Sequence, residues 1–160
     1  MPFLAERFKI VPVLSDQDLN AGATMPGDSI YMRNYHHCTF LVNYQTIGGA
    51  ANYVKVYSGA TDGATTTALT FNYAFGGAAA GSASCDVLAA WSTSANLSVA
   101  HATYDNYLLV IEVSAASMGA GHKWLTIQFE DTDTGATGNV AVIAVLQPRY
   151  TNNRSLTALA

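Results

Sequence analysis

The fold is decided by the stretch Tyr107-Leu108-Leu109-Val110-Ile111-Glu112-Val113, an apolar run rich in β-branched residues and interrupted only by Glu112. A short, continuous apolar run of this kind is typical of a strand whose two faces are both covered. The segment Ser114–Ala120 that follows changes to small residues, and Ser114 is placed to cap a helical turn there. We therefore expect a central strand over 107–113, followed by one short helical turn.

Further strands are expected on both sides of this stretch, because apolar and polar residues alternate with the period of two that a half-buried strand requires. Trp124–Glu130 alternates most clearly, with its odd-numbered apolar residues on one face. The other expected strands are Phe8–Leu14, Ile30–Met32, Cys38–Tyr44, Tyr53–Tyr57, Leu69–Phe75, Ala95–Ala102 and Val140–Leu146. Val87–Trp91 is compatible with a helix or a strand, and Pro12 indicates a sheet edge or a bulge in the first strand.

Turn and loop signals separate these segments every roughly 8 to 15 residues, which is the spacing of an all-β sandwich or barrel. Loops of polar or small residues are expected at 16–28, 76–84 and 131–138. We expect an all-β, single-domain antiparallel sandwich that is jelly-roll-like, with about eight strands and one short helical turn. The domain spans residues 1–150, with residues 1–14 as an N-terminal arm or strand, and residues 151–160 form a flexible C-terminal tail.

The surface of this chain must be unusually poor in charge. Only 11% of its 160 residues are charged and 50% are hydrophobic, whereas ordinary soluble domains carry about 25% charged residues. Few ions then have to lose their hydration water when this surface meets another protein. Composition therefore favours assembly with other copies or with partners over a chain that diffuses alone.

The charge pattern and the apolar runs argue against two classes of partner. The formal net charge is -4 and no basic stripe occurs, so nucleic acid is not an expected partner. The longest apolar run, Val140–Leu146, is far shorter than the roughly 20 residues of a membrane-spanning helix. The charges within Met1–Lys9 interrupt the apolar core that a secretory signal requires, so synthesis in the cytoplasm is expected.

Two sets of residues resemble metal ligands. His36, His37 and Cys38 are of the types that bind zinc, but neighbouring residues on a strand point to opposite faces. The loop that begins at Asp131 resembles a calcium loop, yet the position that needs a closing Glu is Val142. Structural histidines and a solvated hairpin loop are the favoured interpretations, with a zinc site and a loose calcium site as alternatives. No cofactor is expected.

The remaining reactive residues do not assemble into a known catalytic motif. Cys38 and Cys85 are expected to be buried free thiols, with one disulfide between them as the alternative. Glu112, inside an apolar strand, is either a buried acid or the partner of Lys123, Arg33 or another subunit. Nucleophile elbows, Walker loops and zinc-protease motifs do not occur in the sequence. The chain is therefore not expected to be an enzyme.

The aromatic residues are numerous, with nine Tyr, six Phe and two Trp. Most of them occupy alternating strand positions, from which a sandwich core draws its bulk. A core role is the favoured interpretation. A subunit interface, or a sugar-binding site that uses Trp91 or Trp124, is the alternative.

Four segments, taken in order, carry a family resemblance. They are Glu6-Arg7-Phe8 before Ile10-Val11-Pro12-Val13, Met32-Arg33-Asn34-Tyr35 before a strand with a Cys, Val110-Ile111-Glu112-Val113 before a Ser/Ala turn, and Ala144-Val145-Leu146-Gln147-Pro148-Arg149-Tyr150. In this arrangement the chain resembles small virion proteins of tailed bacteriophages, described as minor capsid, decoration or cement proteins. The resemblance extends over nearly the whole chain, as far as Tyr150.

The resemblance implies an all-β protein on the outside of an icosahedral shell, commonly a trimer where capsomers meet, and it transfers no catalytic residue. We therefore expect a structural virion protein, assembled in the host cytoplasm, that binds the capsid surface and stabilises it by bridging capsomers. Its expected partners are the major capsid protein and its own copies in a homotrimer. A tail, baseplate or fibre-attachment module and a carbohydrate-binding jelly-roll domain are the alternatives.

The two ends of the domain are the expected contact regions. An apolar N-terminal strand can be donated to a neighbouring subunit, and many weak contacts add up in a shell. We therefore expect the segments 3–13 and 147–150 to lie near the subunit or capsid interface. The interface candidates are Phe3, Phe8, Ile10, Val11, Val13, Gln147, Arg149 and Tyr150.

Overall fold

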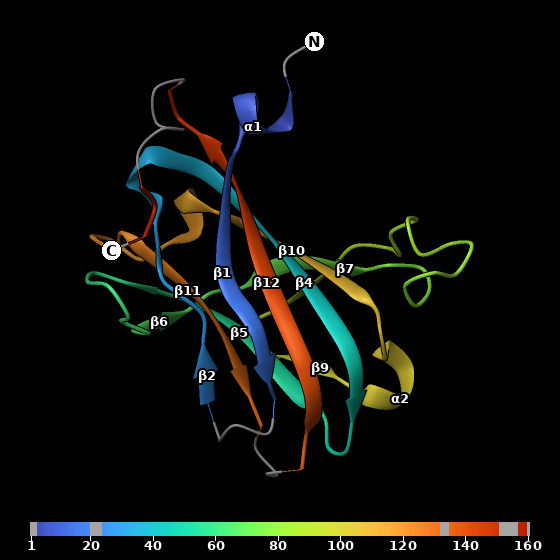
Figure 1. The fold of residues 1–160 in the computed structure, drawn as a ribbon. Helices are drawn as coiled ribbons and strands as arrows, with labels where there is room; N and C mark the ends of the chain where they lie inside the picture. Colours follow the sequence, from blue (N-terminus) through green and yellow to red (C-terminus); the bar gives the residue numbers. More distant parts are fainter. Residues whose placement is uncertain (1–2, 20–23, 132–134, 151–156, 160) are drawn as a thin grey trace.

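Two antiparallel sheets pack face to face in the computed structural model, which describes residues 3–19, 24–131, 135–150 and 157–159 (Figure 1). The strands are β1 (Lys9–Asp18), β2 (Thr24–Pro26), β3 (Ile30–Tyr31), β4 (Tyr35–Gly48), β5 (Asn52–Gly59), β6 (Thr67–Ala68), β7 (Phe71–Phe75), β8 (Ser92–Ser94), β9 (Leu97–Val99), β10 (Leu108–Ser114), β11 (Trp124–Glu130) and β12 (Thr137–Pro148). The helical turns are α1 (Leu4–Arg7), η1 (Met32–Asn34), α2 (His101–Tyr104) and η2 (Ala115–Ser117). The all-β sandwich expected from the sequence is confirmed.

The strand pairs are nested along the chain. β1 pairs with β12, β2 and β3 pair with β11, β4 pairs with β10, and β5 pairs with β6 and β9. The chain therefore folds like one long hairpin that wraps into two sheets, which is the arrangement of a jelly roll. The first sheet has the order β1-β12-β4-β10-β7-β8, and the second contains β2-β11-β5-β6 with β3 and β9 alongside.

β10, which contains most of the apolar run 107–113, lies inside the first sheet between β4 and β7. Its residues Leu109, Ile111 and Val113 face the core. On the outer face Val110 is buried, but Glu112 is exposed. The prediction that both faces of this strand are covered is therefore wrong at Glu112, because the second sheet packs on the opposite face.

The core between the sheets is built from alternate residues of the strands. Tyr44 of β4 and Phe129 of β11 meet edge to face across the two sheets, with ring centroids 6.4 Å apart. The Tyr44 hydroxyl donates to Asn52 Oδ1 at 3.2 Å, so this buried polar group has a partner. Burial raises the pKa of Tyr44 well above its usual value. The largest fully buried side chains are Tyr35, Tyr44, Phe40, Phe71, Phe129, Ile30, Met32, Leu109, Ile111, Leu125, Ile127 and Leu146.

Several element boundaries differ from the sequence-based expectations. β4 and β12 are longer than predicted, because polar residues at exposed positions continue the alternation beyond the apolar centre. The region 16–28, expected to be a loop, contains the end of β1 and all of β2. The strand expected over 95–102 is the short β9 followed by α2. Short strands and single helical turns have too few residues to show a period.

The helical turn expected after β10 is present as η2. The Ser114 hydroxyl accepts a hydrogen bond from the Ala116 N–H at 3.2 Å, which confirms the predicted cap. The prediction of a single helical turn is wrong, since α1, η1 and α2 are also described. Each of these has three or four residues.

Two irregularities set the course of β1 and β12. The pairing of β1 with β12 shifts register between Pro12 and Leu14, as expected for a proline on an edge strand. β12 shifts register against β4 just after Gly138, whose φ is 100°. A Cβ at Gly138 would lie 2.1 Å from the carbonyl oxygen of Thr46, so the bulge accepts only glycine.

The end of the described chain packs against β3. The carbonyl of Ala158 accepts a hydrogen bond from the Tyr31 N–H at 2.8 Å, and Ala158 is buried. The remainder of the expected tail, residues 151–156 and 160, lies outside the described residues. Within the described chain, helices of the length and apolarity needed to span a bilayer are absent.

Candidate interaction surface

The outer face of the first sheet is apolar where β1, β12 and β4 run side by side (Figure 1). Strand register places Pro12 opposite Ile143, and Ile143 opposite Leu41. In the neighbouring row Ile10 lies opposite Val145. We call Ile10, Pro12, Leu41, Ile143 and Val145 the outer patch.

The outer patch is accessible to a partner. Ile143 retains 45% of its surface and Ile10 retains 42%. Outward-facing positions of an antiparallel sheet are ordinarily polar when water covers them. Five neighbouring apolar positions on one face are therefore the mark of a surface that another molecule covers.

The outer face of the second sheet combines charged and polar side chains with the aromatic residues Tyr31 and Trp124. Lys55 of β5 forms an ion pair with Glu130 of β11, and Gln128 donates to the same carboxylate at 2.7 Å. Nearby, the hydroxyls of Ser29 and Thr126 are 2.6 Å apart. Polar groups on this side are thus satisfied within the chain, and the two faces of the sandwich differ in what they offer a partner.

A short helix extends beyond the outer patch. α1 has no buried residue, and Phe3 and Leu4 are 77% and 57% exposed. The Phe3 N–H donates to Glu6 Oε2 at 2.7 Å, which closes the turn. A single helical turn without packing is unstable in water. α1 is therefore a segment that contact with another molecule would stabilise.

A groove of about 580 Å³ lies between α1 and the outer face of the first sheet. Leu4 and Phe8 line it on the N-terminal side, and Leu41 and Val145 of the outer patch line it on the sheet. The other lining residues are His37, Thr39, Glu112 and Gln147. The groove connects α1 with the outer patch, and it combines the apolar side chains Leu4, Phe8, Leu41 and Val145 with the carboxylate of Glu112.

The structure brings together part of the predicted interface. Phe8 and Gln147 line the groove, and Phe3 and Ile10 are exposed beside it. Arg149 and Tyr150 line a different pocket, at one end of the sandwich.

Two of the interface candidates are wrong. Val11 and Val13 are each 3% exposed and belong to the core between the sheets. The alternation of β1 turns them inward, while Ile10 and Pro12 turn outward. Moreover, β1 pairs with β12 of its own chain rather than being left for donation.

Comparison with family models, with curated proteins and with solved structures yields no match.

The predicted metal-ligand sets are dispersed. His36 and His37 are exposed, whereas Cys38 faces the core. Asp131 is buried, and its carboxylate accepts from the Ala136 N–H at 2.9 Å, while residues 132–134 lie outside the described chain. Among the described residues, groups of three or more metal-binding side chains do not occur.

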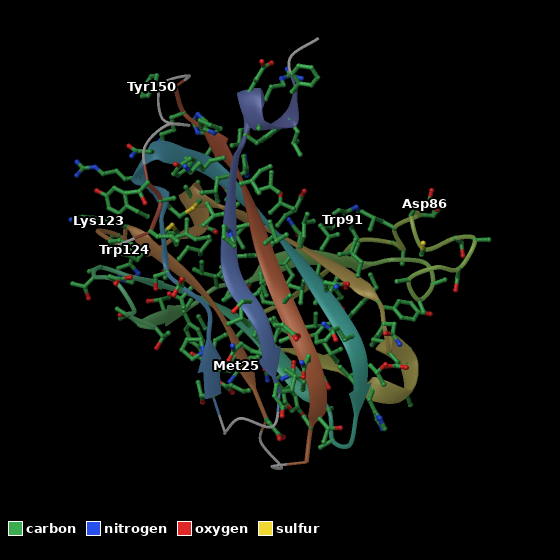
Figure 2. The ribbon with its side chains drawn as sticks, viewed as in Figure 1. Met25, Asp86, Trp91, Lys123, Trp124 and Tyr150 are labelled. Atoms are coloured by element: carbon green, nitrogen blue, oxygen red, sulfur yellow. The ribbon has the colours of Figure 1, made fainter. Side chains whose placement is uncertain are left out.

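The other sequence candidates are also placed. Cys38 and Cys85 are free thiols, the first buried and the second half-buried, and burial raises the pKa of the Cys38 thiol. Glu112 is exposed rather than buried. Trp91 is 47% exposed and lies on the opposite side of the molecule from Trp124, so the two do not form one sugar platform (Figure 2).

Sequence reasoning missed Leu41, Ile143 and Val145 as surface residues. The alternation within β12 could have indicated them, because its inward positions are taken by Val140, Val142, Ala144 and Leu146. Ile143 and Val145 must then face outward. An edge-proximal strand that is apolar at both sets of positions is expected to contact something on each face.

Proposed function

We propose that this chain is a structural virion protein that binds the outside of a phage capsid and stabilises it by bridging capsomers, without catalysis. The observation that carries the proposal is the outer patch together with α1 and the groove between them. These features form an apolar surface on one side of a sandwich whose other sheet keeps its polar groups paired within the chain.

The composition of this surface suits non-covalent binding of many copies to a capsid. Apolar side chains on a rigid sheet lose little conformational freedom when a partner covers them. The 11% charged fraction keeps the desolvation cost of the surrounding surface low. A homotrimer, the proposed oligomer, would present three such surfaces at once, so that weak contacts combine.

The partner would dock on the face of the sheet rather than add a strand to its edge. β1 forms that edge, and Pro12 and two register shifts interrupt its hydrogen-bonding pattern. Such features protect edges against further pairing. Side-chain contacts through α1 and the outer patch are therefore the proposed mode of attachment.

The direct test is co-sedimentation of the purified protein with capsids that lack it. The test variant is Phe3→Ser combined with Leu4→Ser, which removes the large exposed apolar side chains at the start of α1. The matched control is Val87→Ser combined with Leu88→Ser, since these residues are also exposed, at 60% and 39%, but lie in the loop after β7. We expect the wild type and the control to sediment with capsids, and the α1 variant to remain in solution.

Two results would contradict the proposal. One is a wild-type protein that stays in solution beside its parent capsid. The other is an α1 variant that sediments as well as the wild type. Binding to isolated tails instead of capsids would support the tail or baseplate alternative, which uses the same surface in fewer copies per particle.

A further inference from the structure

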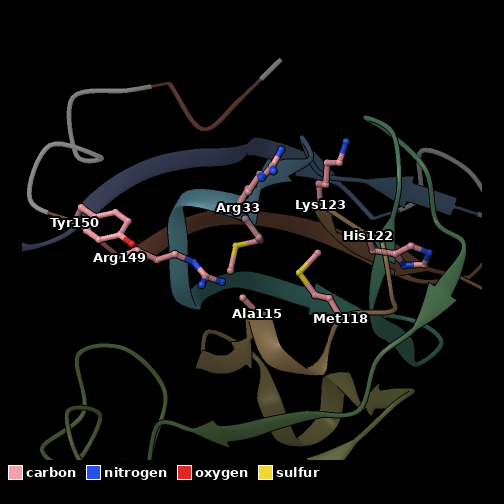
Figure 3. Close-up of a pocket in the computed structure, with 9 residues that line it drawn as sticks. Arg33, Ala115, Met118, His122, Lys123, Arg149 and Tyr150 are labelled. Carbon is pink, nitrogen blue, oxygen red and sulfur yellow. The ribbon is translucent and has the colours of Figure 1, made fainter.

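A pocket of about 550 Å³ opens at one end of the sandwich, where three connections meet (Figure 3). These are η1, the turn 118–123 that precedes β11, and the chain just after β12. The Met32 N–H donates to the Lys123 carbonyl at 2.7 Å, and the Arg149 N–H donates to the Asn34 carbonyl at 2.9 Å. Backbone hydrogen bonds thus tie the three connections together and form the pocket before any ligand arrives.

Positive charge is concentrated in this pocket. Arg33, Lys123 and Arg149 line it, and they are three of the seven Lys and Arg residues in a chain whose net charge is -4. Among the described residues that line it, Asp and Glu do not occur. Because like charges repel, this arrangement favours a bound anion.

Carboxylates elsewhere in the described chain do not neutralise these cations. The ion pair between described residues joins Lys55 to Glu130, on the outer face of the second sheet. Arg33 and Lys123 are exposed, and Figure 3 shows them extending in the same direction from the pocket wall. Their long side chains can turn toward a ligand without disturbing the fold.

Arg149 is held in place by the fold. Its Nε donates to the Tyr35 carbonyl at 3.1 Å, which orients the guanidinium group. In Figure 3 this group lies toward the centre of the pocket. A fixed guanidinium offers paired N–H donors to the oxygens of a phosphate, a sulfate or a carboxylate.

The floor of the pocket is apolar. Met32 is buried, and Met118 and Ala115 are half-buried around it. Methionine side chains adapt to ligands of different shape. The pocket therefore has cationic walls for an anionic head and an apolar floor for a carbon body, within the roughly 300 to 1,000 Å³ of typical small-molecule sites.

We propose that this pocket binds a small organic phosphate monoester. The anionic head lies between Arg33, Lys123 and Arg149, and the organic body rests on the methionines. A doubly charged head balances three cations better than a single carboxylate does. This site is separate from the outer patch, and its occupation does not depend on the virion role.

The test is isothermal titration of the full chain with phenyl phosphate at pH 7.5 and low salt. Inorganic phosphate, benzoate and a peptide of alternating Glu and Gly are titrated beside it. We expect phenyl phosphate to bind most tightly, because it alone combines a doubly charged head with an apolar body. Arg33→Gln and Lys123→Gln are each expected to weaken this binding about tenfold, the effect of losing one charge-assisted hydrogen bond.

Arg7→Gln provides the matched control, since it removes the same charge from exposed α1, outside the pocket. We expect its affinity for phenyl phosphate to equal that of the wild type. Three results would overturn the proposal: no heat with phenyl phosphate, an equal loss in the Arg7→Gln control, or tighter binding of the acidic peptide. The last result would assign the pocket to contact with a protein.

Discussion

Replacing Ile143 with Thr tests whether the outer patch attaches this protein to its partner. Ile143 lies at the centre of the patch, opposite both Pro12 and Leu41, and 45% of it is exposed. Complete burial of an isoleucine contributes roughly 1.5–3 kcal/mol. Covering the exposed part of Ile143 is therefore worth about 1 kcal/mol per copy. The Ile143→Thr variant keeps the β-branch, so β12 retains its strand preference.

The proposed trimer multiplies this loss. Three copies that bind together lose about 3 kcal/mol, which corresponds to a roughly 100-fold weaker attachment to the capsid. The free energy of unfolding should fall by less than about 1 kcal/mol, since the residue is half-exposed. Val87→Thr makes a similar change at a residue that is 60% exposed in the loop after β7.

The assay is quantitative binding of labelled protein to capsids, with urea denaturation of each variant alongside. We expect Ile143→Thr to bind roughly 100-fold more weakly, and Val87→Thr to bind like the wild type. Equal affinity of Ile143→Thr and wild type would refute the reasoning. So would an equal loss of affinity in both variants, since it would show that apolar surface anywhere on the chain promotes binding.

Three further predictions concern the fold. A thiol reagent should label Cys85 in the native protein and leave Cys38 unmodified until unfolding, since burial raises the pKa of the Cys38 thiol; equal labelling rates would contradict this. Because burial raises the pKa of Tyr44, the unfolded chain loses that proton first. The free energy of unfolding should therefore be unaffected by this group below about pH 10 and fall above it by up to about 1.4 kcal/mol per pH unit. In the Tyr44→Phe variant the fall should be less steep. Urea denaturation between pH 8 and 11 measures both. Gly138→Ala should lower the free energy of unfolding by about 2 kcal/mol or more in the same assay, because its Cβ would collide with a carbonyl. The control Gly63→Ala, at a residue with φ 71° and open space around it, should lower it by about 1 kcal/mol. Similar losses in the two variants would show that the bulge relaxes.

Much of the fold follows from local sequence pattern. Trp124–Glu130 forms β11 with the predicted bounds, and Ser114 caps the turn after β10. These features depend on neighbouring residues alone, so a single sequence contains them. In contrast, Thr126 and Gln128 occupy the polar positions of this alternation, which predicts exposed side chains, but both are buried. The Thr126 hydroxyl lies against Ser29, almost a hundred positions earlier, and no local pattern indicates such a contact.

The candidate surface could be predicted from the sequence only where it depends on neighbouring residues. The exposed apolar residues Phe3 and Ile10 are visible in the sequence as an apolar N-terminal segment. The pairing of Ile143 with Leu41 depends on the order of the strands, which the sequence does not display. The basic pocket was missed because Arg33, Lys123 and Arg149 lie far apart in the chain. Only the nested strand order brings their connections to one end of the sandwich.

We propose that this protein attaches to a capsid through the outer patch and α1. The most direct measurement is a cryo-electron microscopy reconstruction of the parent particle at a resolution that places side chains. We predict that Ile10, Leu41 and Ile143 lie against capsid protein, with α1 in contact beside them. A particle in which this face of the first sheet points to solvent, with the second sheet against the capsid, would contradict the account.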